Sequence, residues 1–95
     1  MSRKDAYEKK LEAQLKEWKT DIDKMKAKAD KADAEAKLEY YKQIEDLRTK
    51  QEAAQKKLTE LKAAGESAWE DLKAGIDLAW KSLGESIKSA RSRFN

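Results

Sequence analysis

The chain has 95 residues, of which 43% are charged, yet the formal net charge is only +3. Ala, Glu, Lys, Leu and Arg together make up 60% of the residues, whereas valine is absent. Long helices and coiled coils are enriched in these five residue types, and β-sheets need the β-branched residues that are scarce here. The composition therefore excludes a sheet protein and predicts an all-α fold.

Several kinds of chemistry are excluded by residues that the sequence does not contain. There is no cysteine, and so no disulfide, thiolate nucleophile or thiolate zinc site. There is no histidine either, which removes the commonest general base and transition-metal ligand. The three glycines, Gly65, Gly75 and Gly84, lie about ten residues apart and form no phosphate-binding loop. We therefore expect no enzymatic activity, no cofactor and no metal.

The first predicted element is a long amphipathic helix over residues 4–63. Between Tyr7 and Leu61, apolar or small residues recur in fifteen steps of three or four residues that span 54 residues. The mean step of 3.6 is the period of a straight α-helix. In the middle, over residues 26–37, the only apolar residues are five alanines. This segment is either a close crossing point between helices or a solvated helical spacer.

The second element is a turn over residues 64–67. Gly65 suits the left-handed position that follows a helix, and Ser67 with Glu70 forms a capping box for the next helix. The alternative is one unbroken helix, because the apolar stripe passes from Leu61 through Gly65 to Trp69 in phase. A helical Gly65 would cost only about 1 kcal/mol relative to alanine.

The third element is a second amphipathic helix over residues 68–93, which contains an 11-residue repeat. The segment 68–76 (AWEDLKAGI) aligns with the segment 79–87 (AWKSLGESI). Eleven residues make three helical turns, so both copies face the same side of the helix. The two helices are expected to fold into a hairpin through one set of packing residues: Tyr40, Ile44, Leu47, Leu58, Leu61, Trp69, Leu72, Ile76, Trp80, Leu83 and Ile87.

The unequal lengths of the two helices predict self-association. At 1.5 Å per residue the first helix is about 90 Å long and the second about 40 Å, so the hairpin covers only residues 38–61 of the first helix. One apolar row is left without a partner: Tyr7, Leu11, Leu15, Trp18, Ile22 and Met25. A chain of this size rarely stabilises itself by burial alone. We expect an antiparallel coiled-coil or helix-bundle homo-oligomer, either a dimer or a tetramer.

Other partners are judged from aromatic residues and charge. The tryptophans lie in phase with the apolar stripes, and the only basic cluster is a short tail of Lys88, Arg91 and Arg93. The electrostatic footprint of nucleic-acid binding is therefore missing. A membrane surface or another protein is the alternative partner, because tryptophan-containing amphipathic repeats also suit the lipid interface. No apolar leader and no run of 18 apolar residues is present, so the expected location is the cytoplasm.

The paired Ala-Trp units at 68–69 and 79–80, behind a helix rich in Lys, Glu and Ala, carry a resemblance. The chain resembles small bacterial coiled-coil proteins of mostly unknown function, some of which are described as stress-response proteins. More loosely, residues 26–37 and the 11-residue period are similar to late-embryogenesis-abundant and apolipoprotein-like repeats. These resemblances imply protection of proteins or membranes, with no catalytic residues.

The sequence thus predicts a non-enzymatic structural or interaction protein, self-associating through coiled-coil helices and associated with stress. The alternative is an amphipathic helix that protects membranes or proteins and becomes ordered on a lipid surface.

Overall fold

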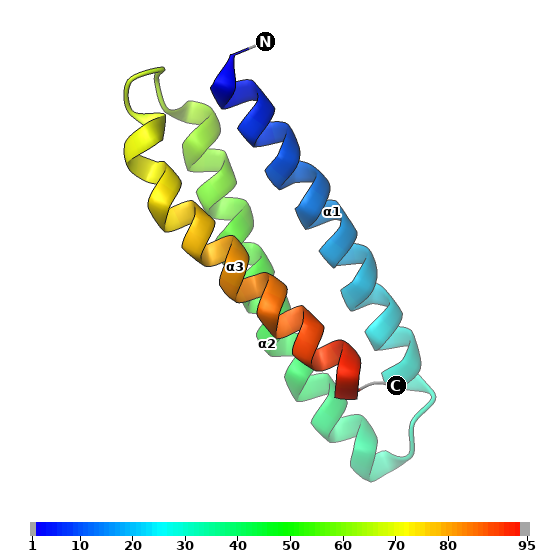
Figure 1. Cartoon of the computed structure of the whole chain (residues 1–95). Helices are drawn as coiled ribbons and strands as arrows, with labels where there is room; N and C mark the ends of the chain where they lie inside the picture. Colours follow the sequence, from blue (N-terminus) through cyan, green and yellow to red (C-terminus); the bar gives the residue numbers. More distant parts are fainter. Residues whose placement is uncertain (1, 94–95) are drawn as a thin grey trace.

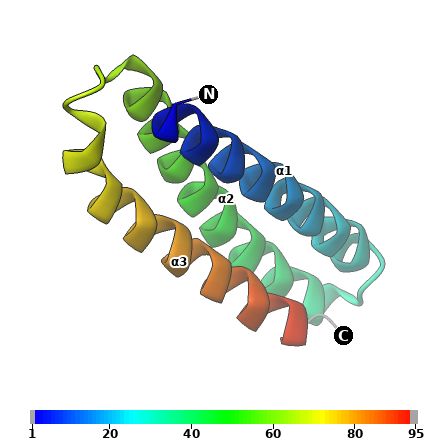
Figure 2. The same ribbon diagram turned by 45° about the horizontal axis from the view of Figure 1, so that its top comes forward.

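The fold is an all-α bundle of three helices, seen in a computed structural model that describes residues 2–93 (Figure 1). The helices are α1 (Arg3–Asp30), α2 (Ala34–Ala63) and α3 (Trp69–Arg93). They lie side by side, with α2 antiparallel to both α1 and α3 (Figures 1 and 2). The bundle measures 51 × 19 × 18 Å. The all-α prediction is confirmed, but the number of helices differs from the predicted two.

The predicted continuous helix over residues 4–63 is wrong, because the chain turns back between Asp30 and Ala34. Asp33 has an extended backbone (φ −68°, ψ 168°), and its carboxylate accepts a hydrogen bond from the Ala36 amide at 3.0 Å. This is an N-cap, which typically stabilises a helix start by about 1 kcal/mol. The turn lets the apolar face of α1 be buried within its own chain, and this burial outweighs the few helical bonds lost at the bend.

The turn between α2 and α3 was predicted in the right place but with a different geometry. Ala64 is extended, with φ −74° and ψ 143°, and no described residue has a positive φ, so Gly65 does not take the left-handed conformation. The carbonyl of Gly65 accepts hydrogen bonds from the amides of Ala68 and Trp69, at 3.1 and 3.2 Å. Backbone bonds to Gly65, two residues before the expected Ser67 cap, therefore close the turn that leads into α3, and Glu70 lies in the first turn of the helix.

A single apolar core runs along the axis of the bundle between the three helices. Its most deeply buried large side chains are Ile22 from α1, Leu58 and Leu61 from α2, and Leu83 and Ile87 from α3. No buried polar or charged residue occurs among the described residues. The core is therefore held mainly by apolar packing.

Candidate functional site

The row of residues predicted as a self-association interface lies in the core of the chain itself. Leu11, Leu15, Ile22 and Met25 are buried, and Tyr7 and Trp18 are partly buried against the same core. The reason to expect self-association was an uncovered apolar row on the first helix. In the structure α2 and α3 cover that row, so these residues are not a free surface.

The residues predicted to pack between the helices all reach the core. Nine are buried: Ile44, Leu47, Leu58, Leu61, Trp69, Ile76, Trp80, Leu83 and Ile87. Tyr40 and Leu72 are partly buried against the core. They pack in a bundle of three helices, because α1 occupies the side that a two-helix hairpin would leave open.

A groove of about 390 Å³ follows the line where α1 faces α3. Its floor contains Leu11, Trp18, Trp80 and Gly84. Trp18 is only partly buried, so this large aromatic ring faces the groove as well as the core. Half-exposed tryptophans in a hollow are frequent anchors of protein–protein contacts, because they bury a large area at little entropic cost. The groove is the candidate functional site.

The absence of a side chain at Gly84 determines how deeply Trp18 lies against α3. A β-carbon added to Gly84 would lie 3.1 Å from Cζ2 of Trp18, which is closer than normal packing allows. Trp80 reaches from α3 to α1, where its Nε1 donates a hydrogen bond to the backbone carbonyl of Leu11 at 3.4 Å. Trp18 of α1 and Trp80 of α3 thus each contact the opposite helix beneath the groove.

Polar contacts close one end of the groove and lie beyond the other. At one end the hydroxyl of Tyr7 donates a short hydrogen bond to Asp77, and the ring of Tyr7 lies 5.8 Å from that of Trp69. Beyond the other end, about one helical turn past Trp18 and Lys88, Arg91 pairs with Asp21 at 3.8 Å. Burial of the Tyr7 hydroxyl, followed by its bond to Asp77, raises the pKa of Tyr7 well above its usual value.

The raised pKa of Tyr7 predicts a specific loss of stability in alkali. The fold favours the protonated phenol, so this contribution is fully present below pH 10, the usual tyrosine pKa, and is lost as the pH rises beyond it. Above pH 10, wild type should lose unfolding free energy more steeply than Tyr7→Phe. The difference should stay below the roughly 1.4 kcal/mol per pH unit that one proton can contribute, because the ring is partly exposed.

Urea unfolding of both proteins at pH 8, 9, 10 and 11 would measure this difference. Tyr7→Phe retains the ring packing against Trp69 and removes only the hydroxyl. Parallel losses in the two proteins over the whole pH range would show that Tyr7 does not report on the closed end of the groove.

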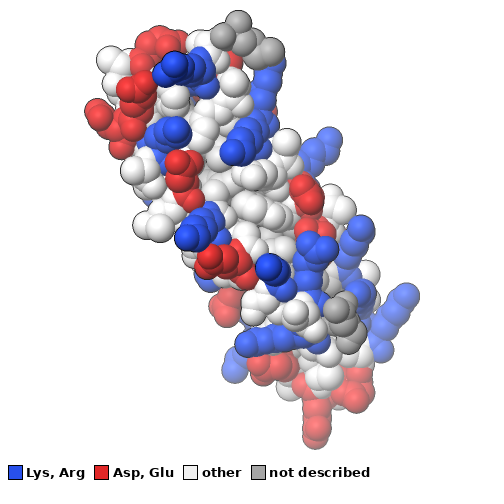
Figure 3. All heavy atoms as spheres, in the orientation of Figure 1, with Lys and Arg blue, Asp and Glu red and all other residues white. Residues whose placement is uncertain are grey.

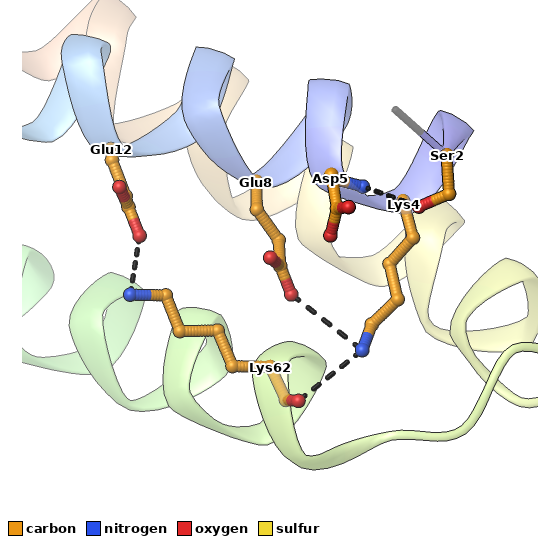
Figure 4. A network of polar contacts seen from close by, with 6 residues as sticks. All are labelled: Ser2, Lys4, Asp5, Glu8, Glu12 and Lys62. Atoms are coloured by element: carbon orange, nitrogen blue, oxygen red, sulfur yellow. Dashed lines mark hydrogen bonds and ion pairs between the residues drawn. The ribbon is translucent and has the colours of Figure 1, made fainter.

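On the opposite side of α1, polar contacts to α2 cluster at the N-terminal end of the bundle (Figure 4). Lys4 pairs with Glu8 at 3.7 Å, and its Nζ donates to the Lys62 carbonyl at 3.2 Å. The ammonium of Lys62 in turn pairs with Glu12, and this contact raises the pKa of Lys62. Surface ion pairs contribute little stability each, and the contacts that join α1 to α2 here are those of Lys62 with Lys4 and Glu12.

Charged side chains line both sides of the α1–α3 groove. Figure 3 shows uncharged atoms along the middle of this face, with blue and red side chains on either side. The rim residues on α3 are Asp77, Lys81, Glu85 and Lys88, and Lys10 lies on the α1 side. Along α3 the rim therefore runs acidic, basic, acidic, basic, and the uncharged strip lies inside a mixed charged border.

The known proteins give no parallel for this arrangement: no family model, curated protein or solved structure matches the chain. Within residues 2–93, no helix is long and apolar enough to cross a bilayer. Over the same residues, no three carboxylates lie in a cluster that could hold a metal ion.

Proposed function

We propose that the protein is a non-enzymatic structural or interaction protein that self-associates, with the α1–α3 groove as its contact surface. The observation that carries this proposal is the order of charges along the groove rim of α3. Two copies placed face to face and antiparallel, about an axis near residues 82 and 83, would bring Asp77 opposite Lys88 of the second copy. The same axis would bring Lys81 opposite Glu85. The rim is therefore complementary to itself.

The floor of the groove supports the same partner. Trp18 is half-buried in the closed bundle and would be shielded from bulk solvent when two grooves face each other. An apolar centre with a charged rim is the usual organisation of a protein interface, in which the centre supplies affinity and the rim fixes orientation. A structural role agrees with the resemblance to small bacterial coiled-coil proteins, some of them described as stress-response proteins.

Binding to a lipid surface would require a larger structural change than association through the groove. The apolar face of α3, including Ile76, Trp80 and Leu83, is buried in the core. The helices would have to separate before that face could meet lipid. Association through the groove leaves all three helices in place, and for that reason it is the function we propose.

Charge reversal on the rim tests the proposal. Lys81→Glu and Glu85→Lys should each weaken the dimer about tenfold, because each places like charges opposite one another twice in a two-fold interface. The double variant Lys81→Glu/Glu85→Lys should restore the affinity of the wild type. Light scattering on a sizing column, from micromolar to several hundred micromolar protein, would measure the dissociation constants.

Lys42→Glu, an exposed reversal on α2, is the matched control and should leave the affinity unchanged. A monomer of 10.9 kDa at every concentration would refute self-association through the groove. A dimer that neither single variant weakens would place the contact elsewhere, and a double variant no tighter than the single ones would show that Lys81 and Glu85 do not face each other across the interface.

A further inference from the structure

The three-residue bend between α1 and α2 contains no residue that breaks a helix. Lys31, Ala32 and Asp33 include neither glycine nor proline, and no described residue needs a positive φ. Ala and Lys are among the better helix formers. The bend at 64–68, by contrast, contains Gly65. The sequence of the α1–α2 bend therefore does not prevent the two helices from joining into one.

The apolar pattern also continues through the bend without a change of phase. Ala29, Ala32, Ala36 and Tyr40 follow one another at helical spacing, between the apolar face of α1 and that of α2. A straight helix over residues 3–63 would thus have one continuous apolar stripe. The apolar pattern therefore does not oppose joining α1 and α2 into one helix.

The backbone keeps negative φ angles at Lys31 and Asp33, the two ends of the bend. Lys31 has φ −94° and ψ −6°, and its amide still donates to the carbonyl of Lys28 at 3.2 Å. Asp33 departs from helical geometry in ψ alone, since its φ of −68° is that of a helix. At Asp33, a helical conformation therefore differs from the observed one mainly in ψ.

Two polar contacts favour the bent form. The Asp33 carboxylate caps α2 through the Ala36 amide, and the hydroxyl of Tyr41 donates to Asp30 across the bend. In a straight helix residues 30 and 41 would be about 16 Å apart along the axis, so the second contact would be lost. Both contacts lie on exposed residues, where each stabilises the bend only modestly.

We propose that residues 31–33 are a hinge through which two copies exchange α1, so that α1 of each copy packs against α2 and α3 of the other. This inference rests on the proposed self-association, but not on the groove as its contact surface. The second copy enters by exchange of α1 and not by docking of the grooves. The apolar face of α1 makes the same core contacts in the exchanged dimer as in the monomer. Only the bend and its two polar contacts change, and a continuous helix replaces them.

The antiparallel packing of α1 on α2 determines the shape of the exchanged dimer. Two straightened helices would lie antiparallel, with a two-fold axis at the hinges and a three-helix bundle at each end. Each straight helix over residues 3–63 would be about 90 Å long, against 51 Å for the closed bundle. The exchanged dimer is therefore distinguishable by its length as well as by its mass.

A proline at position 34 is compatible with the bent chain but not with the straight helix of the exchanged dimer. Ala34 is the first residue of α2, where proline is tolerated, and Asp33 before it already has the extended backbone that a following proline requires. In the straight helix the same proline would lie in the interior and remove a backbone hydrogen bond. Ala34→Pro should raise the dissociation constant of the exchanged dimer by at least about a thousandfold, because the cost arises in both chains.

Asp33→Ala should act in the opposite direction. It removes the cap of the bend and adds a better helix former, so it should lower the same constant by about tenfold or more. Glu39→Ala, which removes an exposed acidic residue from within α2, is the control and should have little effect. The proteins would be unfolded in guanidinium at several hundred micromolar, refolded, and separated by size with light scattering.

Exchange would be supported if wild type, Asp33→Ala and Glu39→Ala each form a dimer after refolding and Ala34→Pro does not. Small-angle scattering of that dimer should then give a maximum dimension near 90 Å, which also decides the question if Ala34→Pro does not fold. A dimer near the length of the closed bundle, unaffected by Ala34→Pro and lost in Lys81→Glu, would refute exchange while supporting groove docking. Monomeric wild type and Asp33→Ala after refolding would also refute exchange. An exchanged dimer that persists in Lys81→Glu would refute only groove docking.

Discussion

Ile22→Asp should unfold the chain. Ile22 is 0% exposed and lies on α1 between α2 and α3, so an aspartate there would place a carboxyl group in a core with no buried polar residue among those described. Loss of the isoleucine side chain alone typically costs 2–5 kcal/mol, and an unpaired buried polar group adds several kcal/mol more. Small domains are stable by only about 5–15 kcal/mol. We therefore expect loss of the far-ultraviolet helical signal at 25 °C.

Leu38→Asp is the matched control, since it introduces the same residue at a leucine that is 72% exposed near the start of α2. It should change the unfolding free energy by no more than about 0.5 kcal/mol. The pair also separates two views of the α1 row. If Ile22 served only as an interface between copies, Ile22→Asp would give a folded monomer. Retained helicity with a sharp unfolding transition would therefore contradict the burial of α1 within its own chain.

The apolar stripes were the part of the fold that the sequence revealed most directly. The period through Leu11, Leu15, Ile22 and Met25 places all four on one face, and the structure buries all four. Periodicity is a local property of a helix, and it depends only on which face is covered. It does not say what covers that face, so the same stripe was compatible with burial against a partner chain and with burial against α2 and α3.

The bend at residues 31–33 could not be predicted in the same way. The local sequence favours a helix there, and the cap at Asp33 was visible only as one acidic residue among many in a highly charged segment. What favours the bend is the burial of α1 against helices that follow it in the chain. That gain depends on contacts between residues far apart in sequence, which helical propensity does not contain.

The groove, like the bend, depends on contacts between residues far apart in the sequence and could not be predicted from local patterns. Its floor depends on Trp18 lying over Gly84, and one of its ends on Tyr7 reaching Asp77. Each pair is separated by more than 60 residues. The tryptophans were correctly predicted to lie with the core, but only the three-helix arrangement shows that Trp18 is covered on one side alone. The alternating charges on α3 are visible in the sequence, yet they became informative only once α1 placed them beside a groove.

Trp80→Ala should be the most destabilising truncation to alanine in α3. Trp80 is 4% exposed, packs in the core, and donates from Nε1 to the carbonyl of Leu11 on α1. Replacing a buried tryptophan with alanine typically costs about 3–5 kcal/mol, because the lost burial is followed by a cavity that the neighbours fill only in part. The midpoint of urea unfolding should fall accordingly, and α1 should become the least protected helix in hydrogen exchange.

Leu78→Ala, two residues earlier on the same helix, provides the comparison for this loss. Leu78 is 70% exposed, so its truncation removes little buried surface and should change the unfolding free energy by no more than about 0.5 kcal/mol. The difference between the two variants measures how much of the stability of α3 depends on the face turned toward α1. Similar losses in the two variants would mean that α3 is not docked through Trp80. The contact between α1 and α3 that forms the groove would then have to be abandoned, together with the interface proposed on it.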